Sequence, residues 1–196
     1  TLSYTTSPVH NNEYFLEMAK KLESMGSDTL AIKDMAGLLT PQSTKELVSL
    51  LTKNISIPIH VHSHATAGLA SLNLIAAVEA GATIIDTCNS SFSEGASHPT
   101  TESIIAALQS MGYEINIDIA AIDSISEYLR EARKKYWQFE SEFTGVDPRV
   151  LSNQVPGGMI SNLSNQLKDQ DALDKMDDVL KEIPEVRKDL GYPPLV

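Results

Sequence analysis

The sequence predicts an α/β fold with a parallel sheet, followed by a region that contains helices alone. Four strand-like runs each precede a segment of helical periodicity. The runs start at intervals of roughly 25–30 residues, which is the size of one β/α unit. From about Ile119 the strand-like runs stop and only helical patterns continue. Strands that alternate with helices require right-handed crossovers, so the helices should cover the sheet.

The first two strands are expected at Leu2–Thr6 and Thr29–Lys33. Between them, Asn12–Met25 has apolar residues at helical spacing, and Gly26 ends the pattern. The second helix opens with Thr40-Pro41, in which the threonine suits the N-cap and the proline suits the first helical position.

The last two strands are expected at Ile57–His62 and Thr83–Thr87. The helix between them runs from about Gly68 to Ala80, and the helix after them opens near Pro99. A doubly wound sheet and half of a (β/α)8 barrel both satisfy this pattern. No glycine-rich phosphate fingerprint follows any of the strands, which argues against dinucleotide binding.

The rest of the sequence predicts helices. Ile122–Phe139 reads as one long amphipathic helix with basic residues at its C-terminal end, where cations suit the helix dipole. Gln154–Met159 contains Pro-Gly-Gly and interrupts the helical pattern, which then continues through Leu190. We expect a domain boundary within residues 141–156, which divides the chain into residues 1–145 and 146–196.

Composition and charge exclude several classes of protein. The 196 residues are 42% hydrophobic and carry a net charge of −11, which argues against a nucleic-acid surface. The single cysteine, Cys88, excludes an intramolecular disulfide framework and fits the cytoplasm. No apolar run approaches the roughly 20 residues that span a bilayer, and no signal peptide is visible. We interpret both ends, Thr1 and Pro-Pro-Leu-Val196, as cuts in a longer protein.

Three histidines alternate in the third strand, at His60, His62 and His64. Alternation by two places them on one face, which points inward in a barrel. At a rise of about 3.3 Å per residue, His60 and His64 are roughly 13 Å apart, so one metal ion cannot easily use both. His62 and His64 lie nearest the C-terminal end of the strand, where barrel chemistry takes place. The pair predicts a metal site; the alternative is a set of hydrogen-bonded core histidines.

Lys33 ends an otherwise apolar strand, where a bare ammonium group is costly without a partner. It can pair with an acid, act as a base after a fall in its pKa, or react with CO2 to give an anionic carbamate ligand. A salt bridge to a carboxylate elsewhere is the alternative to a functional role. Its position one β/α unit before the histidine pair favours function.

Four motifs resemble those of a known family and occur in the same order. They are Lys33-Asp-Met-Ala-Gly-Leu-Leu-Thr-Pro41, His60-Val-His-Ser-His-Ala-Thr-Ala-Gly68, Ala80-Gly-Ala-Thr-Ile-Ile-Asp86 and Val155-Pro-Gly-Gly-Met-Ile-Ser-Asn-Leu163. The chain resembles the carboxyltransferase domain of pyruvate carboxylase, the α subunit of oxaloacetate decarboxylase and the central subunit of transcarboxylase. The resemblance implies the C-terminal half of a (β/α)8 TIM barrel, followed by the start of an α-helical carboxylase domain.

The resemblance also implies the metal ligands. In this family the lysine of the Lys-Asp-Met-Ala-Gly motif is carbamylated and binds a divalent ion together with two histidines, which implies Lys33, His62 and His64 here. Zn²⁺ is the first expectation, with Co²⁺ and Mn²⁺ as alternatives. A fourth ligand, an aspartate, would lie before Thr1, and a threonine that moves a proton would lie beyond Val196.

Three positions depart from the family pattern. Ala65-Thr66 replaces the Asp-Thr typical of fused pyruvate carboxylases, and resembles the α chain of the decarboxylase and the stand-alone carboxyltransferase chain of two-subunit pyruvate carboxylases. Ser3 stands where relatives often have cysteine. The polar loop Ser90–His98 differs from the usual Met-Ser pattern, so the resemblance assigns no role to it; substrate or biotin binding and a solvated loop both remain open.

The implied function is carboxyl transfer between carboxybiotin and pyruvate or oxaloacetate. The implied partners are a biotin carboxyl carrier domain, a biotin carboxylase or a membrane decarboxylase β subunit, and a second copy in a homodimer. Two alternatives remain open: a metal-dependent lyase or condensing enzyme of the hydroxymethylglutaryl-CoA lyase type, and a non-catalytic scaffold subunit. The expected location is the cytoplasm, or a membrane reached through a partner subunit. The sequence leaves the metal and the enzyme subtype open, and we expect no activity from the 196 residues alone.

Overall fold

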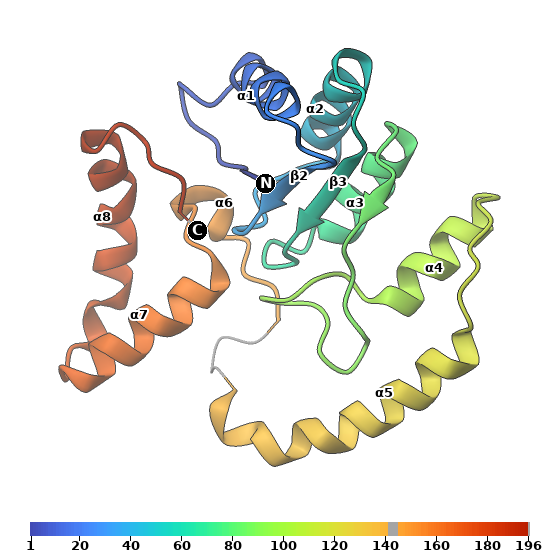
Figure 1. Cartoon of the computed structure of the whole chain (residues 1–196). Helices are drawn as coiled ribbons and strands as arrows, with labels where there is room; N and C mark the ends of the chain where they lie inside the picture. Colours follow the sequence, from blue (N-terminus) through green and yellow to red (C-terminus); the bar gives the residue numbers. More distant parts are fainter. Residues whose placement is uncertain (141–144, 196) are drawn as a thin grey trace.

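A computed structural model of the chain describes residues 1–140 and 145–195. Within these residues, four strands form one parallel sheet in the order β1-β2-β3-β4, as Figure 1 shows. The strands are β1 (Leu2–Ser3), β2 (Leu30–Asp34), β3 (Ile59–Ser63) and β4 (Ile84–Ile85). All four predicted strands are therefore present, and the predicted α/β class with a parallel sheet is confirmed. Strands that neighbour in sequence also neighbour in the sheet, which is the arrangement within a (β/α)8 barrel.

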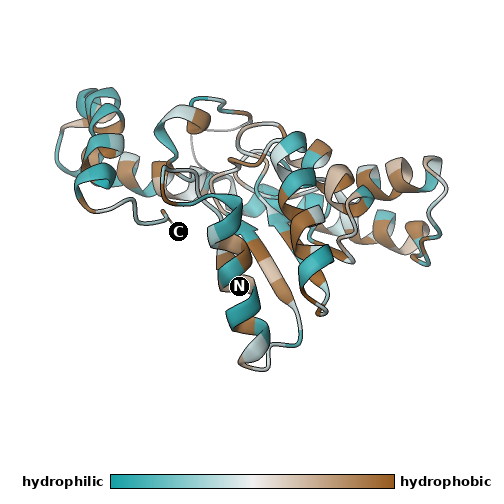
Figure 2. Cartoon of the chain, turned by 90° about the horizontal axis from the view of Figure 1, so that it is seen from above, coloured by the Kyte–Doolittle hydropathy of each residue, from teal (hydrophilic) through white to brown (hydrophobic). Residues whose placement is uncertain are grey.

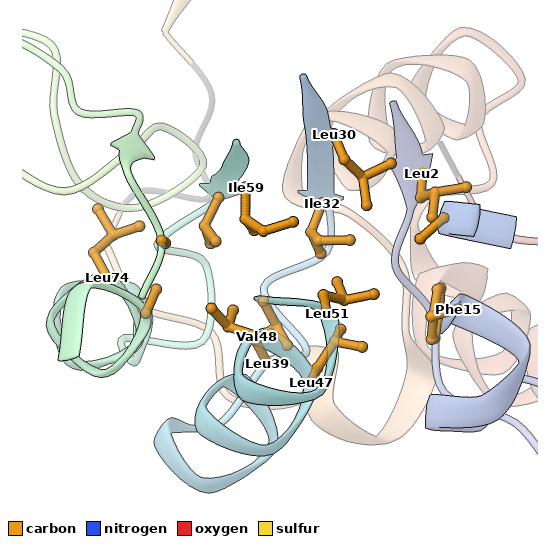
Figure 3. Close-up of a cluster of buried hydrophobic side chains, with 14 of the residues drawn as sticks. Leu2, Phe15, Leu30, Ile32, Leu39, Leu47, Val48, Leu51, Ile59 and Leu74 are labelled. Atoms are coloured by element: carbon orange, nitrogen blue, oxygen red, sulfur yellow. The ribbon is translucent and has the colours of Figure 1, made fainter. Parts of the chain in front are cut away.

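Helices α1 (Asn12–Ser24), α2 (Pro41–Asn54) and α3 (Ala70–Glu79) cover one face of the sheet. Figure 3 shows the apolar layer between them, in which strand side chains such as Ile32 meet Leu51 of α2. The layer is built from side chains exposed by 1% or less, including Phe15, Leu30, Ile32, Leu47, Val48, Leu51, Ile59, Val61 and Leu74. Burial of this apolar area is the main force that holds the helices on the sheet.

Local signals in the sequence fix the helix ends. The Thr40 hydroxyl accepts the backbone N–H of Ser43 at 3.2 Å, and the Ser43 hydroxyl accepts the backbone N–H of Thr40 at 2.9 Å, so the predicted N-cap is confirmed. Gly26 and Gly81 follow α1 and α3 with φ values of 90° and 105°. Only glycine adopts this conformation at little cost, which explains why both helices stop there.

The next segment contains α4 (Thr101–Ser110), α5 (Ile119–Arg133) and a 3₁₀ helix, η1 (Lys134–Phe139). The prediction of one long α-helix at Ile122–Phe139 is therefore wrong in its last turns. No residue of η1 is buried, so no packed face maintains α-helical geometry there. Arg133 ends α5 by donating from Nε to Glu140 at 2.6 Å and from Nη1 to the carbonyl of Ser91 at 2.7 Å.

The remaining helices are α6 (Val150–Asn153), α7 (Gly157–Asp169), η2 (Leu173–Lys175) and α8 (Met176–Asp189). Figure 2 shows α7 and α8 at the opposite end of the molecule from α4 and α5. Their own apolar cluster is Val155, Ile160, Met176 and Leu180. No helix in the described part of the chain is long and apolar enough to cross a membrane.

The predicted domain boundary remains a prediction. Residues 141–144, where the predicted range begins, lie outside the described residues. Val150, which the prediction places in the second domain, is fully buried and packs against Ala36, Leu38 and Ala67. The segment after the boundary therefore begins by packing against the loops that follow β2 and β3.

Candidate metal centre

The pleat of the sheet separates two sets of side chains. In β2 and β3, Asp34 and Ser63 continue the buried face under the helices, whereas Lys33 and His62 point to the other face. Lys33 and His62 are partners in register on neighbouring parallel strands. Both lie at the C-terminal end of the sheet, where barrel enzymes place their chemistry. An open pocket on this face is lined by Thr1, Ser3, Ala31, Lys33, His60, His62 and Asp86.

Three imidazoles converge at this end of the sheet: His62, His64 and His98. The ring centroids are 5.2 Å apart for His62 and His64, 4.2 Å for His62 and His98, and 4.4 Å for His64 and His98. One ligand atom from each lies within 4.8 Å of the others. His62 comes from β3, His64 directly follows it, and His98 comes from the loop between β4 and α4.

Each of the three rings is oriented by an oxygen atom at Nδ1. His62 Nδ1 lies 2.7 Å from Oδ2 of Asp86, and His64 Nδ1 lies 2.6 Å from the carbonyl oxygen of Ala96. His98 Nδ1 lies 3.0 Å from the carbonyl oxygen of Ser63. Because all three oxygens are acceptors, we assign the proton of each neutral ring to Nδ1, which leaves a lone pair on Nε2. None of the three Nε2 atoms has a hydrogen-bond partner within residues 1–140 and 145–195.

The surroundings favour the neutral form of two of these rings. Burial lowers the pKa of His64 to about 4, with smaller contributions from the neighbouring His98, His62 and Lys33. Burial also lowers the pKa of His98 below its ordinary value. A metal ligand must be a neutral imidazole, so the site presents its nitrogen atoms in the form that a metal ion requires.

Asp86 connects the third strand to the fourth. Its Oδ2 accepts from His62, and its Oδ1 lies 2.8 Å from Nε2 of His60. Partial burial raises the pKa of Asp86, but the contacts with His62 and His60 outweigh it and leave that pKa below the ordinary value. His60 is thus directed toward Asp86 and lies outside the group of three histidines.

Lys33 is half-buried and forms no ion pair with any residue that the structure describes. The alternative of a salt bridge therefore has no partner within the described residues. The neighbouring Asp34 is turned away and accepts hydrogen bonds from the backbone N–H groups of Leu38 and Leu39 at 2.8 and 3.0 Å. The two charged residues of the Lys-Asp-Met-Ala-Gly motif thus have separate surroundings, and Lys33 faces the histidines.

Backbone hydrogen bonds position the loop that carries His98. The N–H of Ala65 donates to the carbonyl of Ser97 at 2.7 Å, and the N–H of Cys88 donates to the carbonyl of Pro99 at 2.9 Å. His98 lies between these two attachments. The loop is therefore fastened to the end of β3 on one side of His98 and to the segment after β4 on the other.

The donor set fits a divalent metal ion of borderline softness, such as Zn²⁺, which accepts several imidazoles and an anionic oxygen. The structure brings together the predicted His62 and His64 and places the predicted Lys33 on the adjacent strand. Sequence reasoning missed His98 and Asp86. The available signals were a histidine in a polar loop at the rim of the sheet, and an aspartate that ends the fourth strand-like run.

Comparison with known proteins agrees with this geometry. Residues 2–129 match the family described as HMGL-like, and residues 150–196 match the conserved carboxylase domain. One of the two subunits of pyruvate carboxylase from Methanocaldococcus jannaschii is 53% identical over the whole chain, which covers 35% of that relative. The methylmalonyl-CoA carboxyltransferase 5S subunit of Propionibacterium freudenreichii subsp. shermanii is 42% identical over the whole chain, which covers 39% of that relative.

Solved structures give the same result. The whole chain superimposes on a variant of the carboxyl transferase domain of Rhizobium etli pyruvate carboxylase, solved with pyruvate, with a TM-score of 0.95 and 32% identity. The chain covers 34% of that domain. The chain thus spans about one third of the length of these relatives.

Proposed function

The chain belongs to the HMGL-like family and continues into the conserved carboxylase domain, and from this we propose that it forms part of a biotin-dependent carboxyltransferase acting on pyruvate or oxaloacetate. The observation that supports this most directly is the convergence of His62 and His64 beside Lys33 at the C-terminal end of a parallel sheet. A divalent ion, with Zn²⁺ preferred over Co²⁺ and Mn²⁺, would act there as a Lewis acid toward the keto oxygen of the substrate.

The residues of the chain have distinct tasks in this proposal. His62 and His64 offer Nε2 lone pairs, while Asp86 and the carbonyl of Ala96 orient the two rings through Nδ1. Lys33 reacts through Nζ with CO2, forms an N–C bond, releases a proton and becomes an anionic carbamate ligand. A carbamate needs no salt-bridge partner, which agrees with the unpaired state of Lys33 among the described residues.

The reaction moves one carboxyl group and one proton. The N–C bond of carboxybiotin breaks, the methyl carbon of pyruvate loses a proton to the ureido nitrogen and forms the new C–C bond, and oxaloacetate and biotin result. Oxaloacetate decarboxylation is the reverse. A biotin carboxyl carrier domain must therefore reach this end of the sheet, and a biotin carboxylase or a membrane decarboxylase β subunit completes the cycle. Which of the two partners is used separates a pyruvate carboxylase subunit from a decarboxylase subunit.

Metal analysis of the full-length protein tests the proposal. We expect about one divalent ion per barrel, and we expect none after His62→Ala and His64→Ala are combined. A double variant that retains stoichiometric metal would remove the assignment. Oxaloacetate formed from carboxybiotin and pyruvate should depend on the same two histidines.

An acyl-CoA lyase of the hydroxymethylglutaryl-CoA type is the second candidate, because the matching family is described as HMGL-like. The carboxylase domain match at residues 150–196 favours the carboxyltransferase. Cleavage of an acyl-CoA substrate without any dependence on biotin would support the lyase instead. A scaffold subunit would bind no stoichiometric metal, so the same elemental analysis separates it from both enzymes.

A further inference from the structure

We propose that His98 is a third imidazole ligand of the metal ion, together with His62 and His64. This inference rests on the proposed metal-binding function of the site. It also goes beyond it, because the ligands implied by the family resemblance are Lys33, His62 and His64 alone. His98 lies in a loop that departs from the family pattern, and nothing in that pattern gives the residue a role.

Distance is the first argument. The centroid of His98 is closer to His62, at 4.2 Å, and to His64, at 4.4 Å, than those two are to each other, at 5.2 Å. All three ligand atoms lie within 4.8 Å of one another. Nitrogen ligands about 2.0–2.1 Å from one Zn²⁺ ion require a closer approach than this, which rotation of the rings can supply. If His62 and His64 bind an ion, His98 is therefore within reach of it.

The orientation of the His98 ring is the second argument. Its Nδ1 faces the carbonyl oxygen of Ser63 at 3.0 Å, so the proton belongs on Nδ1 and the lone pair on Nε2. This is the same arrangement as in His62 and His64, and it is the usual second shell of a metal-bound histidine. A structural core histidine would use both nitrogen atoms, whereas the Nε2 of His98 has no hydrogen-bond partner in the described part of the chain.

The attachment of the loop is the third argument. Ser63, whose carbonyl orients His98, lies between His62 and His64 on β3. The hydrogen bond from Ala65 N–H to the carbonyl of Ser97 fastens the residue before His98 to the same segment. The strand that carries two of the ligands therefore also positions the third, which lowers the entropy that metal binding must overcome.

The test uses the full-length protein and measures the metal itself. Zn²⁺ affinity is determined by competition with a chelator for the wild type, His98→Gln and the matched control His10→Gln. His10 is a half-buried histidine whose ring contacts Ser7 and Tyr14, outside the group of three. Loss of an outer-shell partner already weakens metal binding by about 10–100-fold. We expect His98→Gln to lose about 100-fold or more, and His10→Gln to bind as the wild type does.

The Co²⁺ form of His98→Cys gives a positive signal and an independent route if His98→Gln does not fold. A thiolate at a ligand position coordinates Co²⁺ and produces an intense near-ultraviolet charge-transfer band, because cysteine sulfur is a good ligand for such ions. The wild type already contains one cysteine, Cys88, and serves as the control for a thiol elsewhere. We expect the band in His98→Cys and its absence in the wild type.

The outcomes separate the two proposals. Wild-type Zn²⁺ affinity in His98→Gln, or a folded His98→Cys variant without the band, overturns the role of His98. If the combined His62→Ala and His64→Ala variant still loses its metal in that case, the proposed function stands with two histidine ligands. Metal retained by the combined variant overturns the proposed function, and the role of His98 with it.

Discussion

At the scale of single residues, Lys33 and Asp34 are adjacent in sequence but serve opposite faces of β2. Asp34 is fully buried and accepts hydrogen bonds from Leu38, Leu39 and Ser63 under the helices. Lys33 lies on the pocket side, beside His62 in register. The alternation of side chains along a strand makes this separation necessary. One motif can therefore supply both a structural anion and a functional amine.

Substitution of Lys33 tests the proposed carbamate in the full-length protein. Arginine cannot form a carbamate and places a fixed cation against the metal ion, so Lys33→Arg should lose metal and activity. Glutamate is shorter than a carbamylated lysine but offers an anionic oxygen, so Lys33→Glu should keep part of the metal. Elemental analysis and turnover measure both variants. Near-normal turnover of Lys33→Arg would remove the carbamate from the proposal.

The sequence predicts some of the site residues better than others. The shared face of His62 and His64 follows from their spacing within one strand, which needs no tertiary information. His98 is separated from His64 by more than thirty residues, and its position depends on how an irregular loop folds back onto the end of β3. No periodicity describes such a loop. Its contribution to the site emerges only once backbone hydrogen bonds such as Ala65 N–H to Ser97 O are known.

At the scale of elements, the loop after β2 is held by the side chain of Asp34. Asp34→Ala would leave two buried backbone N–H groups, of Leu38 and Leu39, without partners. Unpaired buried donors of this kind cost about 1–3 kcal/mol each, so we expect a loss of about 3 kcal/mol in the free energy of unfolding. Ser63→Ala is the matched control, because it removes one donor to Asp34 and should cost about 1 kcal/mol. Urea denaturation measures both variants; equal losses would contradict the role of Asp34.

The same loop approaches β3 so closely that only glycine fits at position 37. Gly37 has a φ of 75°, and a Cβ atom there would lie 2.8 Å from the carbonyl oxygen of His64. Gly112 has a φ of 91° and nothing within 4 Å of its Cβ position, so it provides a control with the same backbone strain and no clash. We expect Gly112→Ala to cost about 1 kcal/mol and Gly37→Ala to cost at least about 3 kcal/mol.

The clash at position 37 should also affect the site. Relief of the contact moves the backbone at His64, so Gly37→Ala should weaken Zn²⁺ binding while Gly112→Ala should leave it unchanged. Chemical denaturation and a chelator competition measure the two effects. Equal stability and equal affinity of the two variants would show that the close approach at Gly37 has no consequence.

At the scale of the whole molecule, β1 and β4 each have one neighbouring strand among the described residues. In a closed (β/α)8 barrel every strand has two neighbours. We therefore propose that further strands of the full-length protein pair with these two edges and close the barrel around the pocket of Lys33 and His62. The share of about one third that the chain covers in its relatives leaves room for them. The order of the four strands follows from the β/α repeat, whereas closure depends on residues outside the chain.

The C-terminal helices are joined to the sheet through one buried guanidinium group, that of Arg187. Arg187 on α8 is 5% exposed and donates to Oγ1 of Thr5 at 2.9 Å, to the carbonyl of Pro193 at 3.0 Å, and to the side chain of Gln154. Gln154 in turn donates to Oγ1 of Thr6 at 2.8 Å. Burial lowers the pKa of Arg187, and no carboxylate in the described ranges forms an ion pair with it. The group therefore depends on a fork of neutral acceptors, which only a guanidinium can satisfy together.

Replacement of Arg187 should release the C-terminal helices without unfolding the sheet. Methionine has a similar length and no donors, so Arg187→Met leaves the Thr5, Gln154 and Pro193 acceptors without their partner, at a cost of about 2–3 kcal/mol. Because the apolar layer of β2, β3 and α2 does not include this residue, hydrogen exchange should accelerate in residues 150–195 and stay slow in the strands. Arg130→Met removes an exposed arginine of α5 and should change neither region. Unchanged exchange in residues 150–195 of Arg187→Met would show that the apolar contacts of Val150 alone hold the C-terminal helices against the sheet.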